Sequence, residues 1–277
     1  MKLSTCAKIN IGLNVVSRRD DGYHNLETVF FPVPLYDTLE LHVEQGKSGG
    51  RCELTMSGIT ISGDIHDNLV VRAYHYLNER YSVPSVRVHL NKEIPSQAGL
   101  GGGSSDAAAM LKLLNEEFCL NISEEELCLL ARQLGADCPF FIRSVPVYAT
   151  GIGDEFEPLP EMSDCLRGKY LVMVKPPVSV STGQAYSRVK PRPSVFCCKN
   201  IVRESIERWK ELLVNDFEQS VFSQLPILSD VKSALYAHGA EYVQMSGSGS
   251  TVFAIFGSAP LTLPKYEDDT FMYVTRL

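Results

Sequence analysis

The chain has 277 residues, of which 44% are hydrophobic and 21% are charged, and this composition excludes a disordered or fibrous protein. Its formal net charge is −7, so we expect no general affinity for nucleic acids or anionic membranes, while a local basic pocket stays compatible with the sequence. No apolar run approaches the roughly 20 residues of a membrane span, and the first residues lack the apolar core of a signal peptide.

The first half of the chain alternates between extended and helical patterns. In chain order the sequence predicts strands at 9–16, 26–33 and 37–43, a turn at 46–51, a strand at 52–56, a helix at 68–80 and a strand at 85–90. A glycine-rich loop at 91–103 leads into a helix that starts at Ser104. Ser123 and Glu126 form a capping box for the next helix.

A polar, proline-bearing connection at 158–168 separates the second half from the first. The elements predicted after it are a strand at 169–175, helices at 200–213 and 229–238, a glycine-serine turn at 245–250, and strands at 251–256 and 272–277. This order of strands and helices is typical of an α+β protein with two halves. We therefore expect one domain over 1–160 and a second over 161–277.

The eight cysteines contain no C-x-x-C pair, which argues against a zinc site or a disulfide framework. We interpret them as reduced, mostly buried thiols of a cytoplasmic protein. The adjacent Cys197 and Cys198 are not explained by any pattern in the sequence.

The loop between the predicted strand at 85–90 and the helix after it has the character of an anion site. Four of its five residues at 99–103 are glycines, so the backbone can curl and direct its N–H groups at one ligand. The helix that follows adds its unpaired amides and the positive end of its dipole. A phosphate chain fits such a loop better than a neutral ligand.

Two common phosphate motifs do not fit this loop. A Walker A sequence requires Gly-Lys-Ser/Thr at its end, whereas Gly103 is followed by two serines. The dinucleotide fingerprint G-x-G-x-x-G, started at Gly99, would require glycine where Ser104 stands. The second glycine turn, at 245–251, is by itself more typical of a hairpin or bulge.

Asp137 and Lys8 are the candidates for chemistry on a bound phosphate. Phosphoryl transfer requires charge compensation and a group that handles the acceptor's proton. Asp137, placed before Pro139, could serve in that way or could simply cap a helix. Lys8 lies among apolar strand residues and either reaches solvent or pairs with a buried carboxylate. The residues alone leave both alternatives open.

Three segments together resemble the GHMP kinase superfamily. They are Ala7-Lys-Ile-Asn at 7–10, the Pro-x-x-x-Gly-Leu-Gly loop at 95–105, and Ser-Gly-Ser-Gly-Ser at 246–250. Two further segments, Arg-Arg-Asp-Asp-Gly-Tyr-His at 18–24 and Gly-Ala-Asp-Cys-Pro-Phe-Phe at 135–141, are similar to the branch of this superfamily that acts on a CDP-linked methylerythritol. The resemblance spans nearly the whole chain.

The resemblance implies a two-lobed α+β GHMP kinase fold. Its N-terminal lobe, over 1–160, would be similar to ribosomal protein S5, and its C-terminal lobe, over 161–277, would be a ferredoxin-like α/β lobe. The implied activity is ATP-dependent phosphorylation of the 2-hydroxyl of the methylerythritol part, in non-mevalonate isoprenoid precursor synthesis. Mg2+ is expected with ATP, and the sequence identifies no metal ligand.

The resemblance also implies roles for single residues. Asp137 would be the base, and Lys8 its partner, which keeps it ionised. The positions implied to bind ATP are Asn68, Lys92, Pro95, Ser96, Gln97, Ala98, Gly99, Leu100, Gly101, Gly102, Gly103, Ser104 and Ser105. The positions implied to bind the CDP-linked substrate are Asn10, Tyr23, His24, Thr182 and Tyr186. Tyr23 and His24 would hold the cytosine by stacking and hydrogen bonds.

Two other functions are weighed against this one. A kinase for homoserine or a mevalonate derivative is disfavoured because those acceptors lack a pyrimidine for Tyr23 and His24. A catalytically inactive nucleotide sensor is disfavoured by the presence of Lys8, Asp137 and the whole glycine loop. We expect a small-molecule substrate as the partner, no nucleic acid and no membrane, and either a monomer or a homodimer.

Overall fold

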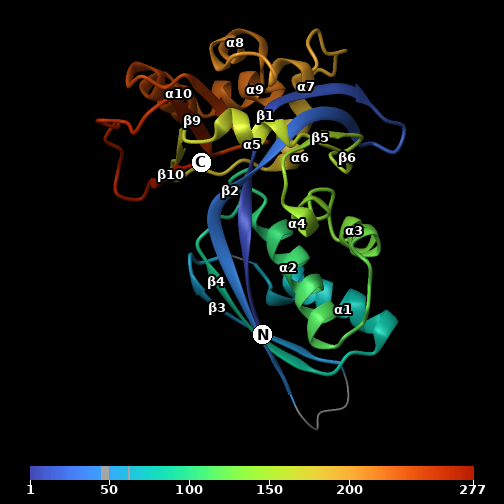
Figure 1. The fold of residues 1–277 in the computed structure, drawn as a ribbon. Coiled ribbons are helices and arrows are strands. Elements are labelled where there is room, and N and C mark those ends of the chain that lie inside the picture. The colour runs from blue at the N-terminus through green and yellow to red at the C-terminus, as the bar shows by residue number, and fades with distance from the viewer. Residues whose placement is uncertain (45–49, 62) are drawn as a thin grey trace. The chain divides into compact units, whose positions relative to one another are not determined.

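The computed structural model describes residues 1–44, 50–61 and 63–277, so most of the turn expected at 46–51 lies outside the described residues. The chain divides into two compact units (Figure 1). Unit 1 comprises residues 1–7, 34–96 and 101–144, and unit 2 comprises residues 8–33, 97–100 and 145–277. Strands β1 (Lys2–Arg18) and β2 (His24–Val43) each contribute residues to both units.

Unit 1 contains a β-α-β arrangement of β3 (Cys52–Gly58), α1 (Leu69–Tyr81) and β4 (Val86–Lys92). Strands β3 and β4 pair in parallel, which requires a crossover, and α1 supplies it. The other edge of β4 pairs antiparallel with β2, with Thr38 opposite Asn91. A short 3-10 helix, Ile65–Asp67, precedes α1.

Three more helices complete unit 1, namely α2 (Gly102–Glu117), α3 (Glu124–Arg132) and α4 (Phe140–Arg143). Helix α2 is the central one, because α1, α3 and α4 all pack against it (Figure 1). The predicted cap of α3 is confirmed, since the Ser123 hydroxyl accepts a hydrogen bond from the Glu126 amide at 3.2 Å.

Unit 2 contains a four-stranded antiparallel sheet in the order β10 (Phe271–Arg276), β7 (Tyr170–Lys175), β9 (Val252–Phe256) and β8 (Tyr242–Met245). Within this unit, the N-terminal part of β2 pairs with β5 (Val147–Thr150), which pairs with β6 (Glu155–Pro158). The glycine-serine turn predicted at 245–250 joins β8 to β9, so it is a hairpin connection as its sequence suggested.

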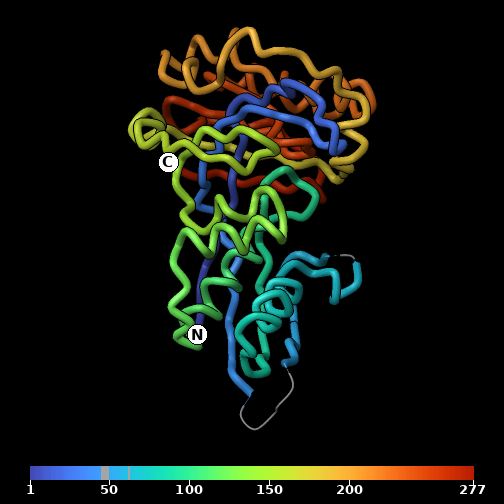
Figure 2. The backbone as a smooth tube through the Cα atoms, turned by 90° about the vertical axis from the view of Figure 1, so that its right-hand side faces the viewer, coloured from blue at the N-terminus to red at the C-terminus, as the bar shows by residue number. Residues whose placement is uncertain are grey.

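The helices of unit 2 are α5 (Glu161–Leu166), α6 (Thr182–Arg188), α7 (Cys198–Ile201), α8 (Ile206–Leu212), α9 (Asp216–Gln224) and α10 (Pro226–Ala237). Apolar side chains of α9 and α10 pack on the sheet and form a core with β7, β8 and β9. Figure 2 draws these two helices in orange. The single helix expected at 200–213 is two helices, because the chain turns after α7 and Ser205 starts α8 as its N-cap, a position that serine favours.

The two compact units differ from the domains expected over 1–160 and 161–277. Strands β1 and β2 each contribute residues to both units, so a single break at residue 160 does not separate the units. The lobe boundary itself stays a prediction. Among the described residues, no helix has both the length and the apolar character needed to cross a bilayer.

Candidate active site

The glycine loop of the sequence runs from the end of β4 to the start of α2. Three of its residues have positive φ angles: Gln97 at 49°, Gly99 at 73° and Gly101 at 72°. Gly101 is the N-cap of α2 and provides no side-chain hydrogen bond to the helix. The first amides of α2 therefore receive no side-chain cap, which is the condition under which a helix start binds an anion.

In unit 2, two carbonyl groups of the loop residues 97–100 accept hydrogen bonds from the segment 246–251. The hydroxyl of Ser246 donates to the Gly99 carbonyl at 2.8 Å, and the Thr251 amide donates to the Ala98 carbonyl at 3.2 Å. A Cβ on Gly99 would lie 2.0 Å from the Ser246 carbonyl oxygen, so no other residue fits there. Ala98 and Gly99 are thus joined to the turn at 246–251.

Lys8 lies in the same part of unit 2. Its amide donates to the Leu100 carbonyl at 2.9 Å, and its Nζ donates to Asn10 Oδ1 at 2.6 Å. The side chain lies over the ring of Phe30 and the residue is only 4% exposed, which excludes the alternative in which Lys8 reaches solvent. Asn10 Nδ2 also donates a hydrogen bond to the Thr28 hydroxyl. The backbone amide of Asn10 donates to the Ser246 hydroxyl at 3.2 Å, which fixes Asn10 beside the turn.

Asp137 belongs to unit 1 and lies in a turn at 135–138 that packs against the start of α2. A Cβ on Gly135 would lie 4.0 Å from the hydroxyl oxygen of Ser104, and Ser104 is also a hydrogen-bonding neighbour of the Cys138 thiol. The helix that follows, α4, has Pro139 as its N-cap, so Asp137 is not the cap of this helix. Asp137 itself is half-buried in this turn, whose Gly135 and Cys138 adjoin Ser104 in the first turn of α2.

Two other predicted ATP positions have defined partners in unit 1. Asn68 is the N-cap of α1, where its Oδ1 accepts from the Val70 amide at 2.9 Å. The hydroxyl of Ser105 donates to the Cys6 carbonyl at 2.6 Å and lies close to the hydroxyl of Thr5, so this serine fixes α2 to β1.

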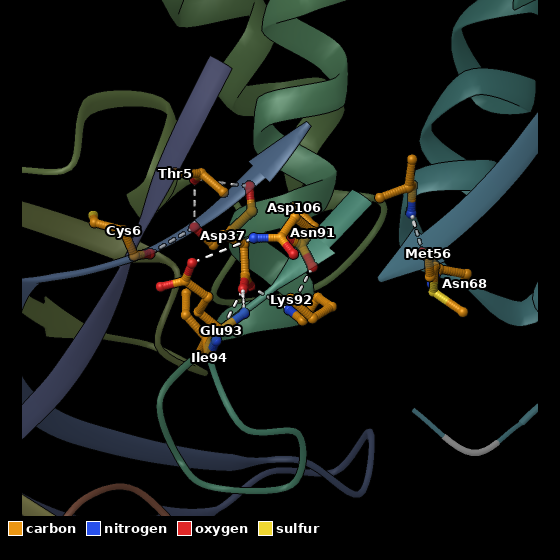
Figure 3. A network of polar contacts seen from close by, with 12 residues as sticks. Thr5, Cys6, Asp37, Met56, Asn68, Asn91, Lys92, Glu93, Ile94 and Asp106 are labelled. Carbon is orange, nitrogen blue, oxygen red and sulfur yellow. Dashed lines mark hydrogen bonds and ion pairs between the residues drawn. The ribbon is translucent and has the colours of Figure 1, made fainter. Parts of the chain in front are cut away.

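Lys92 is buried between two carboxylates, as Figure 3 shows. It pairs with Asp37 on β2 and with Asp106 on α2, the latter at 2.7 Å. Burial raises the pKa of the Asp106 carboxyl, Lys92 lowers it, and Asp37 raises it again. Asp37 and Asp106 were missed from the sequence. The signal was present, because Lys92 continues the buried phase of β4 that includes Val88 and Leu90.

The residues predicted to bind cytidine fall into two groups within unit 2. His24 and Tyr186 stack, with ring centroids 5.0 Å apart and an angle of 22° between their planes. The hydroxyls of Thr182 and Ser248 lie 3.2 Å apart, which links α6 to the turn at 246–251. Tyr23 is 61% exposed and takes no part in either pair. Burial and the nearby Arg18 lower the pKa of His24, which favours the neutral imidazole.

The cysteines are all free thiols, three of them buried and one exposed. Burial raises the pKa of Cys198 well above its usual range, so this thiol is inert at neutral pH. Within the part of the chain that the structure describes, no cluster of three or more His, Cys, Asp and Glu side chains forms a metal site.

Comparison with known proteins identifies the family. Residues 68–144 match the GHMP kinases N terminal domain, and residues 198–268 match the GHMP kinases C terminal domain. A 4-diphosphocytidyl-2-C-methyl-D-erythritol kinase of Bacteroides thetaiotaomicron is 48% identical over 92% of this chain and 93% of that protein. The kinase of the same name from Bacteroides fragilis strain ATCC 25285 is 51% identical over 90% of each chain.

A solved structure agrees with these relatives. The crystal structure of a 4-(cytidine 5'-diphospho)-2C-methyl-D-erythritol kinase matches with a TM-score of 0.77 and 33% identity, over 93% of this chain and 91% of that chain. The fold is therefore the GHMP kinase fold, and the predicted resemblance is confirmed. The chain is a phosphotransferase with an alcohol acceptor and belongs to the 4-diphosphocytidyl-2-C-methyl-D-erythritol kinase family of the GHMP kinases.

Proposed function

We propose that this kinase transfers the γ-phosphoryl group of ATP to the 2-hydroxyl of 4-diphosphocytidyl-2-C-methyl-D-erythritol. One observation carries the proposal. The first amides of α2 have no side-chain cap, and the turn that bears Asp137 packs against Ser104 in the same turn of that helix. A phosphate at the helix start would thus have a carboxylate nearby, and phosphoryl transfer to an alcohol needs both.

In the proposed reaction, the glycine loop and the start of α2 bind the triphosphate through backbone N–H groups. Asp137 accepts the proton of the acceptor hydroxyl, whose oxygen forms a bond to the γ-phosphorus while the bond to the β-phosphate oxygen breaks and ADP leaves. Lys8 offsets the charge at the acceptor oxygen. Mg2+ would be held chiefly by the phosphates, since this ion keeps several waters and uses few protein ligands.

The acceptor would be recognised through its cytidine. A neutral His24 can donate and accept hydrogen bonds at the edge of cytosine, and Tyr186 offers a ring for stacking. The remaining predicted contacts with the substrate are Asn10, Tyr23 and Thr182. Asn10 has its side chain oriented by Lys8 and Thr28, so it can present a fixed amide to the methylerythritol or its phosphates.

The surroundings of the reaction are part of the same proposal. The eight free thiols support a reducing compartment such as the cytoplasm. The net charge of −7 disfavours nucleic acid as a partner. We also propose that the chain has two lobes with a boundary near residue 160 and acts as a monomer or a homodimer.

An acceptor competition tests the proposal. ATP turnover is measured with the CDP-linked methylerythritol beside homoserine and mevalonate, under identical conditions. We expect turnover with the CDP-linked alcohol. Turnover with only the other two acceptors would reject the proposed substrate, and tight binding of ATP without turnover of any acceptor would favour the nucleotide sensor.

A further inference from the structure

Three ionisable side chains are buried together near the start of α2, and we refer to Asp37, Lys92 and Asp106 as the buried triad (Figure 3). Lys92 Nζ donates to Asp106 Oδ2 at 2.7 Å and to Asp37 Oδ2. Each of the three residues is at most 2% exposed. All three belong to unit 1, and none was predicted to act together with the others.

The secondary structure fixes the triad from three directions. Thr38 of β2 lies opposite Asn91 of β4, so the antiparallel register places Asp37 opposite Lys92. Asp106 lies near the start of α2, directly after Ser105, whose hydroxyl is bonded to the Cys6 carbonyl of β1. Two consecutive residues of α2 are thus fixed to the strands beneath.

The triad also holds the other end of the glycine loop. Asp37 Oδ1 accepts hydrogen bonds from the amides of Glu93 and Ile94, at 2.6 and 2.9 Å. These are the first residues after β4, where the loop begins. A single chain of carboxyl, ammonium and carboxyl groups therefore connects the start of the loop with the helix at its end.

The space around the triad is closed. A Cβ on Gly102 would lie 3.2 Å from Lys92 Nζ and 2.9 Å from a side-chain carbon of Ile94. The first turn of α2 consequently rests directly on Lys92. A side chain on Gly102 would therefore press on both Lys92 and Ile94.

Stability alone does not account for this arrangement. Two carboxyls share one buried cation, and Asp106 Oδ1 has no hydrogen-bond partner among the described residues. An additional buried carboxyl with an unsatisfied oxygen costs stability, and an apolar side chain of similar volume is often neutral or better. Precise placement of the loop is a role that the extra carboxyl can perform and that an apolar side chain cannot.

We propose that Asp37 and Asp106 are positioning residues for ATP, which hold Lys92 and thereby set the distance between the two ends of the triphosphate-binding loop. This inference rests on the proposed function, because that loop is taken as the ATP site. The two carboxylates act through Lys92 and the loop backbone and do not contact the nucleotide themselves.

The test separates nucleotide binding from stability. Affinity for a non-hydrolysable ATP analogue is measured by calorimetry for the wild type, Asp106→Leu and Asp106→Asn, together with kcat and the KM of each substrate. We expect Asp106→Leu to melt near the wild-type temperature, to bind the analogue about tenfold more weakly, and to keep kcat and the acceptor KM within about twofold. Asp106→Asn keeps a hydrogen-bond acceptor for Lys92, so its affinity for the analogue should lie between those of the wild type and Asp106→Leu.

Val88→Ala is the matched control, because it truncates a fully buried residue of the same strand without touching the triad. It should lower the melting temperature and leave the analogue's affinity unchanged. Wild-type affinity in both Asp106 variants would overturn the inference, and so would a loss of affinity that merely follows the loss of stability across all three variants.

A measurement on the unmodified protein covers the case in which the Asp106 variants fail to fold. Hydrogen exchange at the amides of Glu93 and Ile94 should slow when the ATP analogue binds and should not respond to CDP. Unchanged exchange on analogue binding would overturn the inference. Binding of the ATP analogue requires no acceptor. If the proposed acceptor is wrong, the competition assay fails while the binding and exchange results stay as expected, so the two failures can be distinguished.

Discussion

Gly99 is the residue at which the proposed ATP site is most sensitive to one added atom. The Cβ of Gly99→Ala would lie 2.0 Å from the Ser246 carbonyl oxygen, whereas real Cβ contacts do not fall below 3.0 Å, so the backbone must shift by at least 1.0 Å. The φ of 73° adds about 1–2 kcal/mol of strain for a residue with a side chain. A misplacement of this size in a binding loop can cost about 10²-fold.

We therefore expect Gly99→Ala to lower kcat/KM for ATP by about 10²-fold and to weaken binding of an ATP analogue comparably, with little change in binding of CDP. Gly239→Ala is the matched control, since Gly239 also has a positive φ, of 91°, but a Cβ there would meet no atom within 4 Å. It should lose stability and keep its affinity for ATP. Equal affinity for the analogue in the two variants would refute the reasoning.

Three further predictions concern other parts of the site. Asp137→Asn should reduce kcat by roughly 10²-fold or more while binding of the ATP analogue persists, because only proton acceptance is lost; near-normal turnover would remove Asp137 from the role of base. Tyr186→Ala should raise the acceptor KM several-fold and leave the ATP KM unchanged, whereas Tyr186→Phe retains the stack with His24; equal values in the two variants would argue against stacking. The pKa of Asp106 is raised to about 7, so in the window from about pH 4 to pH 7 the unfolded chain has released this proton while the folded protein retains it. The contribution of Asp106 to stability therefore falls as pH rises through this window. In urea titrations, Asp106→Asn should therefore gain stability relative to the wild type over that window, and a constant difference would contradict the assignment.

The sequence predicted the strands and helices with strong periodicity. Strand β4 and helix α1 lie within two residues of their predicted bounds, and helix α2 begins two residues before its predicted start at Ser104. The alternation of β4 and the apolar face of α1 are long enough to distinguish a strand from a helix. The short elements β5, β6 and α5 were not predicted. They have four to six residues each, too few for either period to be distinguished.

The chemistry of single residues was harder to predict than the fold. The two interpretations of Lys8, that it reaches solvent or that it pairs with a buried carboxylate, could not be separated in the sequence. Its burial and its contacts with Asn10 and Phe30 exclude the first, and the pairing with a carboxylate stays a prediction. The glycine turn at 246–250 is both a hairpin and a backbone partner of Gly99. Asp37 and Asp106 were missed because they are distant from Lys92 in the sequence and meet it only through the strand register.

The identity of the phosphorylated hydroxyl tests the central claim most directly. The 2-hydroxyl of the acceptor is on the carbon that also bears the methyl group. The carbon bonded to the oxygen of the phosphate ester formed there therefore carries no proton that could split the phosphorus signal. After reaction of ATP with 4-diphosphocytidyl-2-C-methyl-D-erythritol, we expect one new phosphomonoester signal in the proton-coupled 31P spectrum, and we expect it to be unsplit. A doublet or triplet would place the phosphate on another hydroxyl and contradict the account, as would the absence of any new monoester.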